Sequence, residues 1–89
     1  MRTHEIKPSL TKILDKLAKK DKNSYEQIIK KIKEIMNSKD VNHYKNLKTP
    51  LQHLKRVHIK GSFVLTFKYA ESEDKVIFYD FDHHDRIYC

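Results

Sequence analysis

The stretch LKRVHIKGSFVLTFKY, residues 54–69, decides the fold of this 89-residue chain. Apolar and polar residues alternate on both sides of Gly61-Ser62, and β-branched and aromatic residues dominate, as is typical of strands. Glycine followed by serine suits a tight turn. The stretch therefore predicts a β-hairpin whose strands are residues 54–60 and 63–69.

The residues after this hairpin extend it into a three-stranded meander. Glu71-Ser72-Glu73-Asp74 is an acidic run that suits a turn, and strand-forming residues return at positions 75–81. In the middle strand the alternation predicts one stripe for the core, made of Phe63, Leu65, Phe67 and Tyr69.

Two amphipathic helices are predicted upstream of the sheet. The first begins at Pro8-Ser9, since proline fits a first helical turn, and its apolar face consists of Leu10, Ile13, Leu14 and Leu17. The second opens at Ser24, which forms a capping-box pattern with Gln27. Its apolar positions are Tyr25, Ile28, Ile29, Ile32, Ile35 and Met36. Because only residues 21–23 separate the helices, we expect an antiparallel helical hairpin.

The expected fold is α+β in a single domain over residues 1–89. It consists of an N-terminal strand at residues 3–6, the helical hairpin and the antiparallel meander, forming a small twisted, mainly antiparallel sheet covered by two helices. Residues 37–53 are polar and contain Pro50, so they predict a loop that can move.

The net charge of +7 favours a polyanionic partner: RNA, DNA, an anionic membrane or an acidic protein. The charge is uneven, because residues 1–60 hold 16 Lys or Arg against 6 Asp or Glu, and residues 61–89 hold 3 against 6. No segment resembles a signal peptide or approaches the roughly 20 apolar residues that span a bilayer. Because the single cysteine has no partner, we expect a cytosolic, disulfide-free protein.

Titratable groups gather at the end of the chain, in DHHDRIYC at residues 82–89, directly after an apolar run. Imidazoles exchange protons near neutral pH and an arginine can hold an anion, so this cluster is a candidate for acid-base chemistry. The basic strand offers a second half, because alternation puts Arg56, His58 and Lys60 on one face. The competing interpretation is that these three are ordinary solvated residues of a strand. The lysines of the two predicted helices likewise belong, most often, to the solvated outer face of a helix.

Metal-ligand types and a thiol lie at the same end of the chain. Asp82, His83, His84 and Asp85 are metal-ligand types, but adjacent strand residues point to opposite faces, and no spaced His or Cys pair forms a standard zinc site. The pattern therefore favours a metal-free protein with no cofactor over the alternative, a weak fortuitous site for a divalent metal, and it predicts that His83 points away from His84. Cys89 is expected to be an ordinary terminal thiol.

The order of these elements resembles the RelE/ParE superfamily of type II toxins over nearly the whole chain. The most specific segments are Asn46-Leu47-Lys48, residues 54–59, the apolar strand and His84-Asp85-Arg86-Ile87-Tyr88. The YafQ-like RelE branch is the most similar, because its members carry a histidine on the basic strand and another four residues before a C-terminal aromatic. His58, His84 and Tyr88 match those positions.

The resemblance implies a ribosome-dependent endoribonuclease, an mRNA interferase, neutralised by a RelB-like antitoxin in a hetero-oligomeric complex. With metal-free chemistry, His58 would act as base or stabilise the phosphate, His84 as general acid, and Tyr88 would stack on a base or orient the phosphate. The negative charge that grows on the phosphate during cleavage would be stabilised by Arg56, Lys60 and Arg86. Lys45 and Lys48 would hold an RNA backbone.

The chain departs from that family pattern at two positions. Val64 stands where many members carry an arginine, and Ser62 stands near an acidic position of YafQ-like members. Arg56, Lys60 and Arg86 are the candidates to supply the missing positive charge. Two alternatives remain open: a ParE-like toxin that acts on DNA gyrase without nuclease chemistry, and a non-catalytic basic RNA-binding module.

Overall fold

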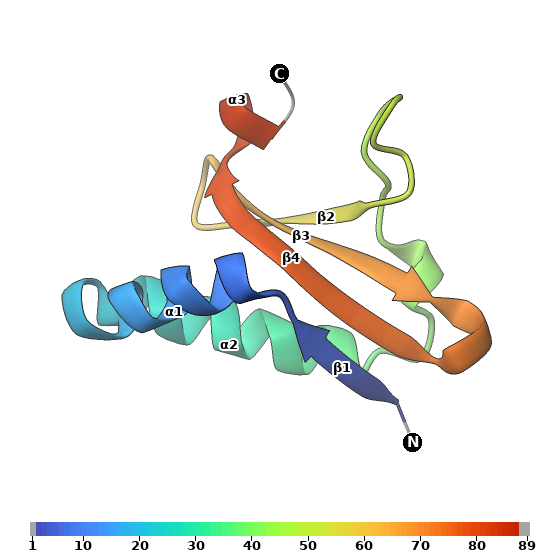
Figure 1. Ribbon diagram of the computed structural model, residues 1–89, viewed down its shortest axis with the longest axis horizontal. Coiled ribbons are helices and arrows are strands. Elements are labelled where there is room, and N and C mark those ends of the chain that lie inside the picture. Colours follow the sequence, from blue (N-terminus) through green and yellow to red (C-terminus); the bar gives the residue numbers. More distant parts are fainter. Residues whose placement is uncertain (1, 88–89) are drawn as a thin grey trace.

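The computed structural model describes residues 2–87, in which two helices pack against one face of a four-stranded sheet (Figure 1). Along the chain the elements are β1 (Thr3–Ile6), α1 (Pro8–Lys20), α2 (Lys22–Met36), the 3-10 helix η1 (Val41–His43), β2 (Lys55–Ile59), β3 (Phe63–Ala70), the 3-10 helix η2 (Glu71–Glu73), β4 (Lys75–His83) and α3 (His84–Ile87). The strand order is β1-β4-β3-β2, with β1 parallel to β4 and the other pairs antiparallel. The predicted α+β fold is confirmed.

The helical hairpin is tighter than the sequence suggested. Only Asp21 separates α1 from α2, and its carboxylate accepts hydrogen bonds from the Ser24 backbone N–H at 3.2 Å and the Ser24 hydroxyl at 2.6 Å. The prediction that Ser24 caps the second helix is wrong, because Asp21 is the N-cap and Ser24 lies inside the first turn. Gln27 bonds instead to Asn23, four residues earlier on the same helix.

The core lies between the helix pair and the sheet. It is built from Leu10 and Leu14 of α1, from α2, and from β2–β4, its buried members including Ile28, Ile32, Ile35, Ile59, Leu65, Phe67, Val76, Phe78 and Phe81. β3 is buried on both faces, because Val64 and Thr66 on the face away from the helices are as inaccessible as Leu65 and Phe67. Phe63, assigned to the buried stripe, is 40% exposed near the hairpin turn.

The last strand and the loop before β2 also differ from the sequence prediction. β4 continues to His83, and the chain then turns into the short helix α3, which was not predicted. The loop predicted at residues 37–53 contains η1, and a β-bridge joins Asn46 to Lys55. This loop and α3 both project from the side of the sheet opposite to α1 and α2 (Figure 1).

Within residues 2–87, no helix combines the length and the apolar character that crossing a bilayer requires.

The Arg2 guanidinium joins the end of α2 to the β3–β4 connection. Its Nη1 donates to the carbonyl oxygens of Ile35 at 3.1 Å, Met36 at 3.1 Å and Ser38 at 2.6 Å. Its Nε donates to Asp74 Oδ1 at 2.9 Å. Carbonyls at a helix C-terminus lack intrahelical donors, so Arg2 supplies what the helix cannot.

Replacing Arg2 with methionine keeps the apolar stem but leaves these oxygens without their charged donor. We expect the free energy of unfolding to fall by about 2 kcal/mol, the range of hydrogen bonds that involve a charged group. Urea denaturation measures this, with Lys16→Met on the exposed face of α1 as control. An equal effect of both substitutions would show that the guanidinium contacts contribute nothing specific.

The same contacts make stability depend on pH. Hydrogen bonds from Arg2 and Tyr69 lower the pKa of Asp74 below its ordinary value of 3.8. A carboxyl group with a depressed pKa stabilises the folded state above that ordinary value, and the contribution is lost as pH falls through the lower folded value. Asp74→Asn should therefore lose stability less steeply than the wild type below pH 3.8. Parallel stability curves, followed by circular dichroism, would contradict this.

Candidate functional site

The sheet face turned away from α1 and α2 carries the polar side chains of the three antiparallel strands. Arg56 on β2 pairs with Thr66 on β3, which pairs with Asp80 on β4. Since alternate strand residues share a face, His58 lies on this face too, two positions from Arg56 or about 7 Å along the strand. Arg56, Thr66 and Asp80 form the floor of the candidate site, and His58 lies beside this floor without lining its cavities.

A cavity of about 520 Å³ opens above this floor, between the loop before β2 and α3. Lys48 and Leu51 of the loop, Arg56 of β2 and Ile87 of α3 lie on its walls, and its remaining lining residues are Asn46, Leu47, Thr49 and Pro50. An adjoining cavity of about 300 Å³ reaches Thr66, Tyr79, Asp80 and Arg86. The two share Leu47, Leu51 and Ile87, so they form one continuous groove, hereafter the loop–α3 groove.

Backbone hydrogen bonds hold the loop beside the sheet. Leu47 N–H donates to the Leu54 carbonyl at 2.8 Å, and Arg56 N–H donates to the Lys45 carbonyl at 2.9 Å. Leu47 itself is buried, with 4% of its surface exposed. The loop wall of the groove is thus anchored at its base by a buried leucine and by strand-like pairing to β2.

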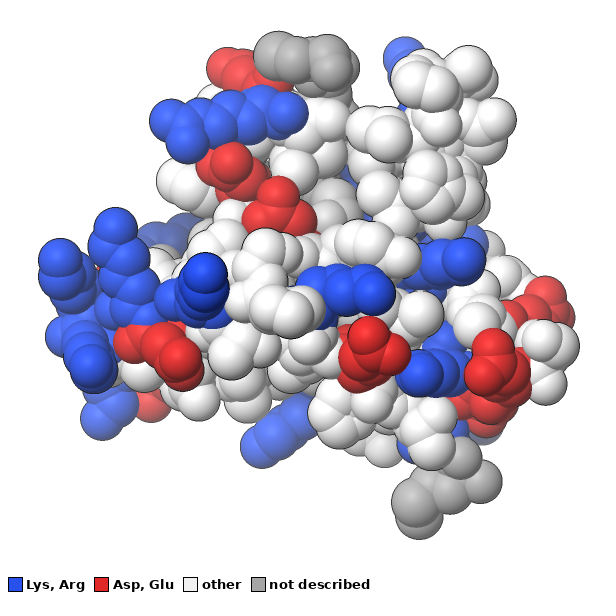
Figure 2. Space-filling view, viewed as in Figure 1, with Lys and Arg blue, Asp and Glu red and all other residues white. Residues whose placement is uncertain are grey.

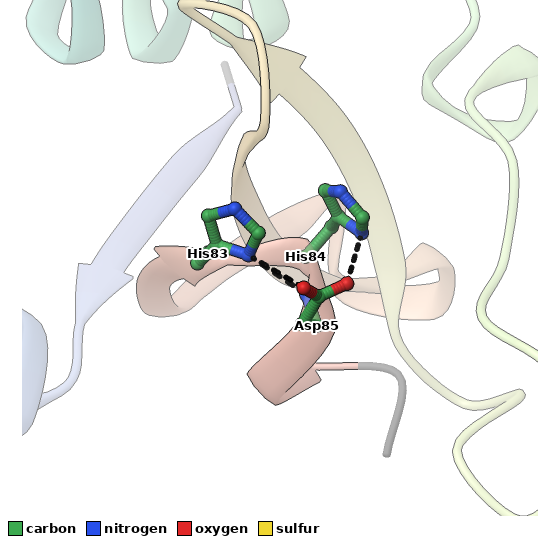
Figure 3. A group of neighbouring side chains, drawn as sticks. All are labelled: His83, His84 and Asp85. Atoms are coloured by element: carbon green, nitrogen blue, oxygen red, sulfur yellow. Dashed lines mark hydrogen bonds and ion pairs between the residues drawn. The ribbon is translucent and has the colours of Figure 1, made fainter.

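His83, His84 and Asp85 lie together where β4 passes into α3 (Figure 3). The two imidazole rings stack with centroids 4.6 Å apart and an interplanar angle of 27°. His84 Nδ1 lies 3.0 Å from Asp85 Oδ1, and His83 Nδ1 lies 3.5 Å from Asp85 Oδ2. The prediction that His83 points away from His84 is wrong, because β4 ends at His83 and the helical turn rotates His84 back beside it.

The carboxylate of Asp85 orients His84. Because Nδ1 of His84 is directed at Asp85, Nε2 is the ring nitrogen that can interact with other groups. An imidazole held at Nδ1 in this way can exchange a proton at Nε2.

The two candidate catalytic histidines come from opposite sides of β3. His58 pairs with Val64, which pairs with Asp82 on β4, so two strand spacings, about 10 Å, separate the Cα atoms of His58 and Asp82. His84 follows Asp82 by two residues, and its backbone N–H donates to the Ser62 carbonyl at 2.8 Å. The β2–β3 turn thus anchors the start of α3 beyond the row that contains His58.

The remaining sequence-predicted residues divide into three groups. Lys48 and Arg56 line the groove, and Arg86, which pairs with Asp82 at 3.7 Å, lines its second part. Lys45 is exposed at the base of the loop. Tyr88, like Cys89, lies outside the described residues.

Lys60 does not share the open face, which corrects the sequence prediction. It belongs to the hairpin turn, where its φ of 57° ends the strand alternation. Its Nζ bonds to Ser24 Oγ at 3.0 Å and lies 3.8 Å from Asp21 Oδ2. Lys60 therefore contacts the start of α2 on the helical side of the sheet.

An arginine was expected at position 64. The residue there, Val64, lies on the sheet face turned away from α1 and α2 and is completely buried. It has no polar atom to offer a phosphate, and its place in the row lies between His58 and Asp82. Positive charge near the groove comes from Lys48, Arg56 and Arg86 instead.

The most conspicuous basic cluster lies away from this groove. Figure 2 shows Lys and Arg side chains gathered over the tip of the helical hairpin, where α1 ends in Lys19 and Lys20 and α2 begins with Lys22. Near α3, acidic and basic side chains alternate.

Four contributors to the site were not among the residues predicted for it. Leu47, Leu51 and Ile87 line the groove, although an irregular loop and an unpredicted helix supply them. Asp85 contacts both histidines. A strand that continued through these residues would not have brought the three side chains together. The run His83-His84-Asp85 was the signal in the sequence, but only the helical turn shows that its side chains lie together.

No family model matches the chain. A protein of Methanocaldococcus jannaschii named "Putative toxin RelE4" is 56% identical over 84 residues, which cover 94% of this chain and 87% of that protein. The isolated Escherichia coli RelE toxin superposes with a TM-score of 0.69 at 17% identity, covering 93% of this chain and 84% of that chain. A structure of the E. coli RelBE toxin-antitoxin complex gives a TM-score of 0.70 at 15% identity, covering 93% and 96%.

Proposed function

The chain belongs to the RelE family of toxins, and from that premise we propose that it is an endoribonuclease that cuts mRNA on the ribosome and so inhibits translation. The observation that carries the proposal is the loop–α3 groove, whose floor holds Arg56 and whose walls hold Lys48 and Arg86. A concave site with convergent cations suits a strand of RNA.

The proposed chemistry uses the RNA's own 2′-hydroxyl as nucleophile. A base removes the 2′-hydroxyl proton, the 2′-oxygen bonds to the adjacent phosphorus, and the bond from phosphorus to the 5′-oxygen breaks. An acid gives its proton to the leaving 5′-oxygen. The products are a 2′,3′-cyclic phosphate and a 5′-hydroxyl, and the step requires no metal ion.

His84 is the proposed general acid, because the Asp85 carboxylate lies 3.0 Å from its Nδ1 and orients its ring. His58, across β3 on the open face, is the proposed base or phosphate-stabilising group. Arg56 lies on the same strand and face and would stabilise the charge that develops on the phosphate oxygens. Tyr88 remains a candidate for stacking on a base.

The proposed partner is a RelB-like antitoxin, because one superposing structure is of a RelBE toxin-antitoxin complex. The net charge of +7 suits an acidic or amphipathic segment that folds as it binds. Co-expression of the chain with the product of a neighbouring short reading frame tests this. Relief of growth inhibition together with co-purification is expected.

Sequencing of RNA ends after brief induction tests the function itself. A nuclease that acts on translating ribosomes gives new mRNA ends in phase with the reading frame. Broken DNA without such ends would indicate a gyrase-directed, ParE-like toxin. Binding to RNA that weakens with salt, with no product formed, would indicate a non-catalytic module.

Replacing Lys48 with glutamine removes one cation from the groove wall without changing the sheet. We expect weaker RNA binding, with the slope of log affinity against log salt reduced by about 1. The maximal cleavage rate should change little, because a backbone contact far from the reacting phosphate serves the ground state and the transition state equally. Lys19→Gln at the hairpin tip is the matched control, and an equal effect of both changes would remove Lys48 from the site.

A further inference from the structure

We propose that His83, His84 and Asp85 bind a divalent transition-metal ion of the Zn²⁺ class, and that the bound ion inhibits RNA cleavage by occupying His84. Two imidazoles and one carboxylate form a donor set that Zn²⁺ accepts, and three protein ligands leave a fourth position open.

The distances between the donor atoms fit such an ion. One ligand atom from each residue is available, and all three lie within 4.8 Å of one another. The two His–Asp separations are 3.0 and 3.5 Å. With metal–ligand bonds of 2.0–2.2 Å, neighbouring ligands of a tetrahedral Zn²⁺ stand about 3.4 Å apart. Small rotations of the side chains therefore complete the site.

Neighbouring groups hold the donors in place before any ion arrives. The Asp85 backbone N–H donates to His83 Nδ1 at 3.2 Å, so the lone pair of that nitrogen faces the cluster, and an ion bound there would take the place of this hydrogen bond. The edge of the His83 ring meets Phe63 at a centroid distance of 5.6 Å and an angle of 80°. His84 is anchored through its backbone N–H to the Ser62 carbonyl.

The cluster is also accessible to ions in solution. The side chains of His83 and His84 are 36% and 37% exposed, and that of Asp85 is 73% exposed. Asp85 can thus swing toward an ion held by the two imidazoles. The nearest arginine in the cluster's helix, Arg86, is paired with Asp82, which offsets its repulsion of a cation.

The inhibitory part of the proposal rests on the proposed nuclease function. An imidazole that ligates a metal through Nδ1 cannot also carry the second proton of an imidazolium. The ion would therefore replace the proton on Nδ1, and His84 would no longer be the imidazolium that gives its Nε2 proton to the leaving 5′-oxygen. It would also withdraw Asp85 from orienting the ring.

Isothermal titration of the tag-free chain with ZnCl2, without RNA, tests the site alone. We expect one ion per chain, with affinity reduced about tenfold or more in both His83→Asn and Asp85→Asn. His53→Asn, which removes an exposed imidazole of the loop, is the matched control and should bind like the wild type. Cys89→Ser should also retain binding. No binding by the wild type, unchanged affinity in the two site variants, or loss of binding in Cys89→Ser alone would overturn the site.

Cleavage assays of the same proteins test the inhibition, with each protein compared with its own rate in EDTA-treated, Zn²⁺-free, Mg²⁺-containing buffer. Saturating Zn²⁺ should lower the wild-type rate at least about tenfold and should have much less effect on Asp85→Asn at the same concentration. Equal inhibition of both would overturn the regulatory role. If the chain binds Zn²⁺ but cuts no RNA, the site stands and the nuclease proposal fails. Circular dichroism melting confirms that each variant is folded.

Discussion

Replacing His84 with alanine is expected to lower the rate of ribosome-bound mRNA cleavage about 10²–10⁴-fold, the range that a general acid contributes. In the proposed mechanism the imidazole donates the proton that the leaving 5′-oxygen needs, and alanine would leave that oxygen to depart as an alkoxide. The fold should persist, because His84 opens a four-residue helix at the end of the sheet and is more than a third exposed.

Single-turnover cleavage on programmed ribosomes measures this effect, and His53→Ala is the matched control on the loop. His83→Ala provides the sharper comparison, because its ring stacks on that of His84 and contacts the same carboxylate. A smaller loss is expected there, since His83 has no assigned proton transfer. A larger loss from His83→Ala than from His84→Ala would reverse the assignment, and undiminished cleavage by folded His84→Ala would remove it.

Replacing Arg56 with glutamine is expected to lower the cleavage rate about 10²–10³-fold, as loss of one donor to a developing oxyanion does. Arg56 lies on the floor of the loop–α3 groove, on the strand and face that also carry His58. Buried Val64 supplies no charge to this face, so the strand guanidinium has a larger share of the phosphate's stabilisation. The maximal rate should therefore fall more than the affinity for RNA.

Lys68→Gln is the matched control for Arg56, because Lys68 is exposed on β3 and lies on the same face farther along the sheet. It should change cleavage little. If Arg56→Gln weakens RNA binding in proportion to the rate and leaves the bound rate unchanged, Arg56 is a docking residue only. Comparison of single-turnover rates at saturating and limiting ribosome concentrations distinguishes the two cases.

The fold could be predicted because its strands and helices carry strong local patterns. The alternation in residues 54–69 identified the hairpin, and the spacing of apolar residues identified both long helices. Long patterned segments average over many side chains, so a single unusual residue does not change the outcome. The antiparallel meander of the last three strands then followed from their short connections.

The site could be predicted only in part, because it depends on short irregular segments. The four residues of α3 are too few to show the periodic pattern that predicts a helix, yet this helical turn brings His83 and His84 together. Lys60 fits the strand alternation in sequence, but its positive φ turns it toward Ser24 and Asp21. The apolar lining of the groove depends on where the loop folds back, which loop composition does not specify.

The chemical nature of the RNA ends tests the central claim most directly. Ribosomes programmed with a defined mRNA are incubated with the chain, and the ends at each cut are identified by mass spectrometry. In parallel, the mRNA carries a single 2′-deoxynucleotide at the cut position. We expect a 2′,3′-cyclic phosphate or its 3′-phosphate hydrolysis product, a 5′-hydroxyl, and no cleavage at the deoxy position. A 3′-hydroxyl with a 5′-phosphate, or cleavage that persists without the 2′-hydroxyl, would contradict the proposed acid-base catalysis.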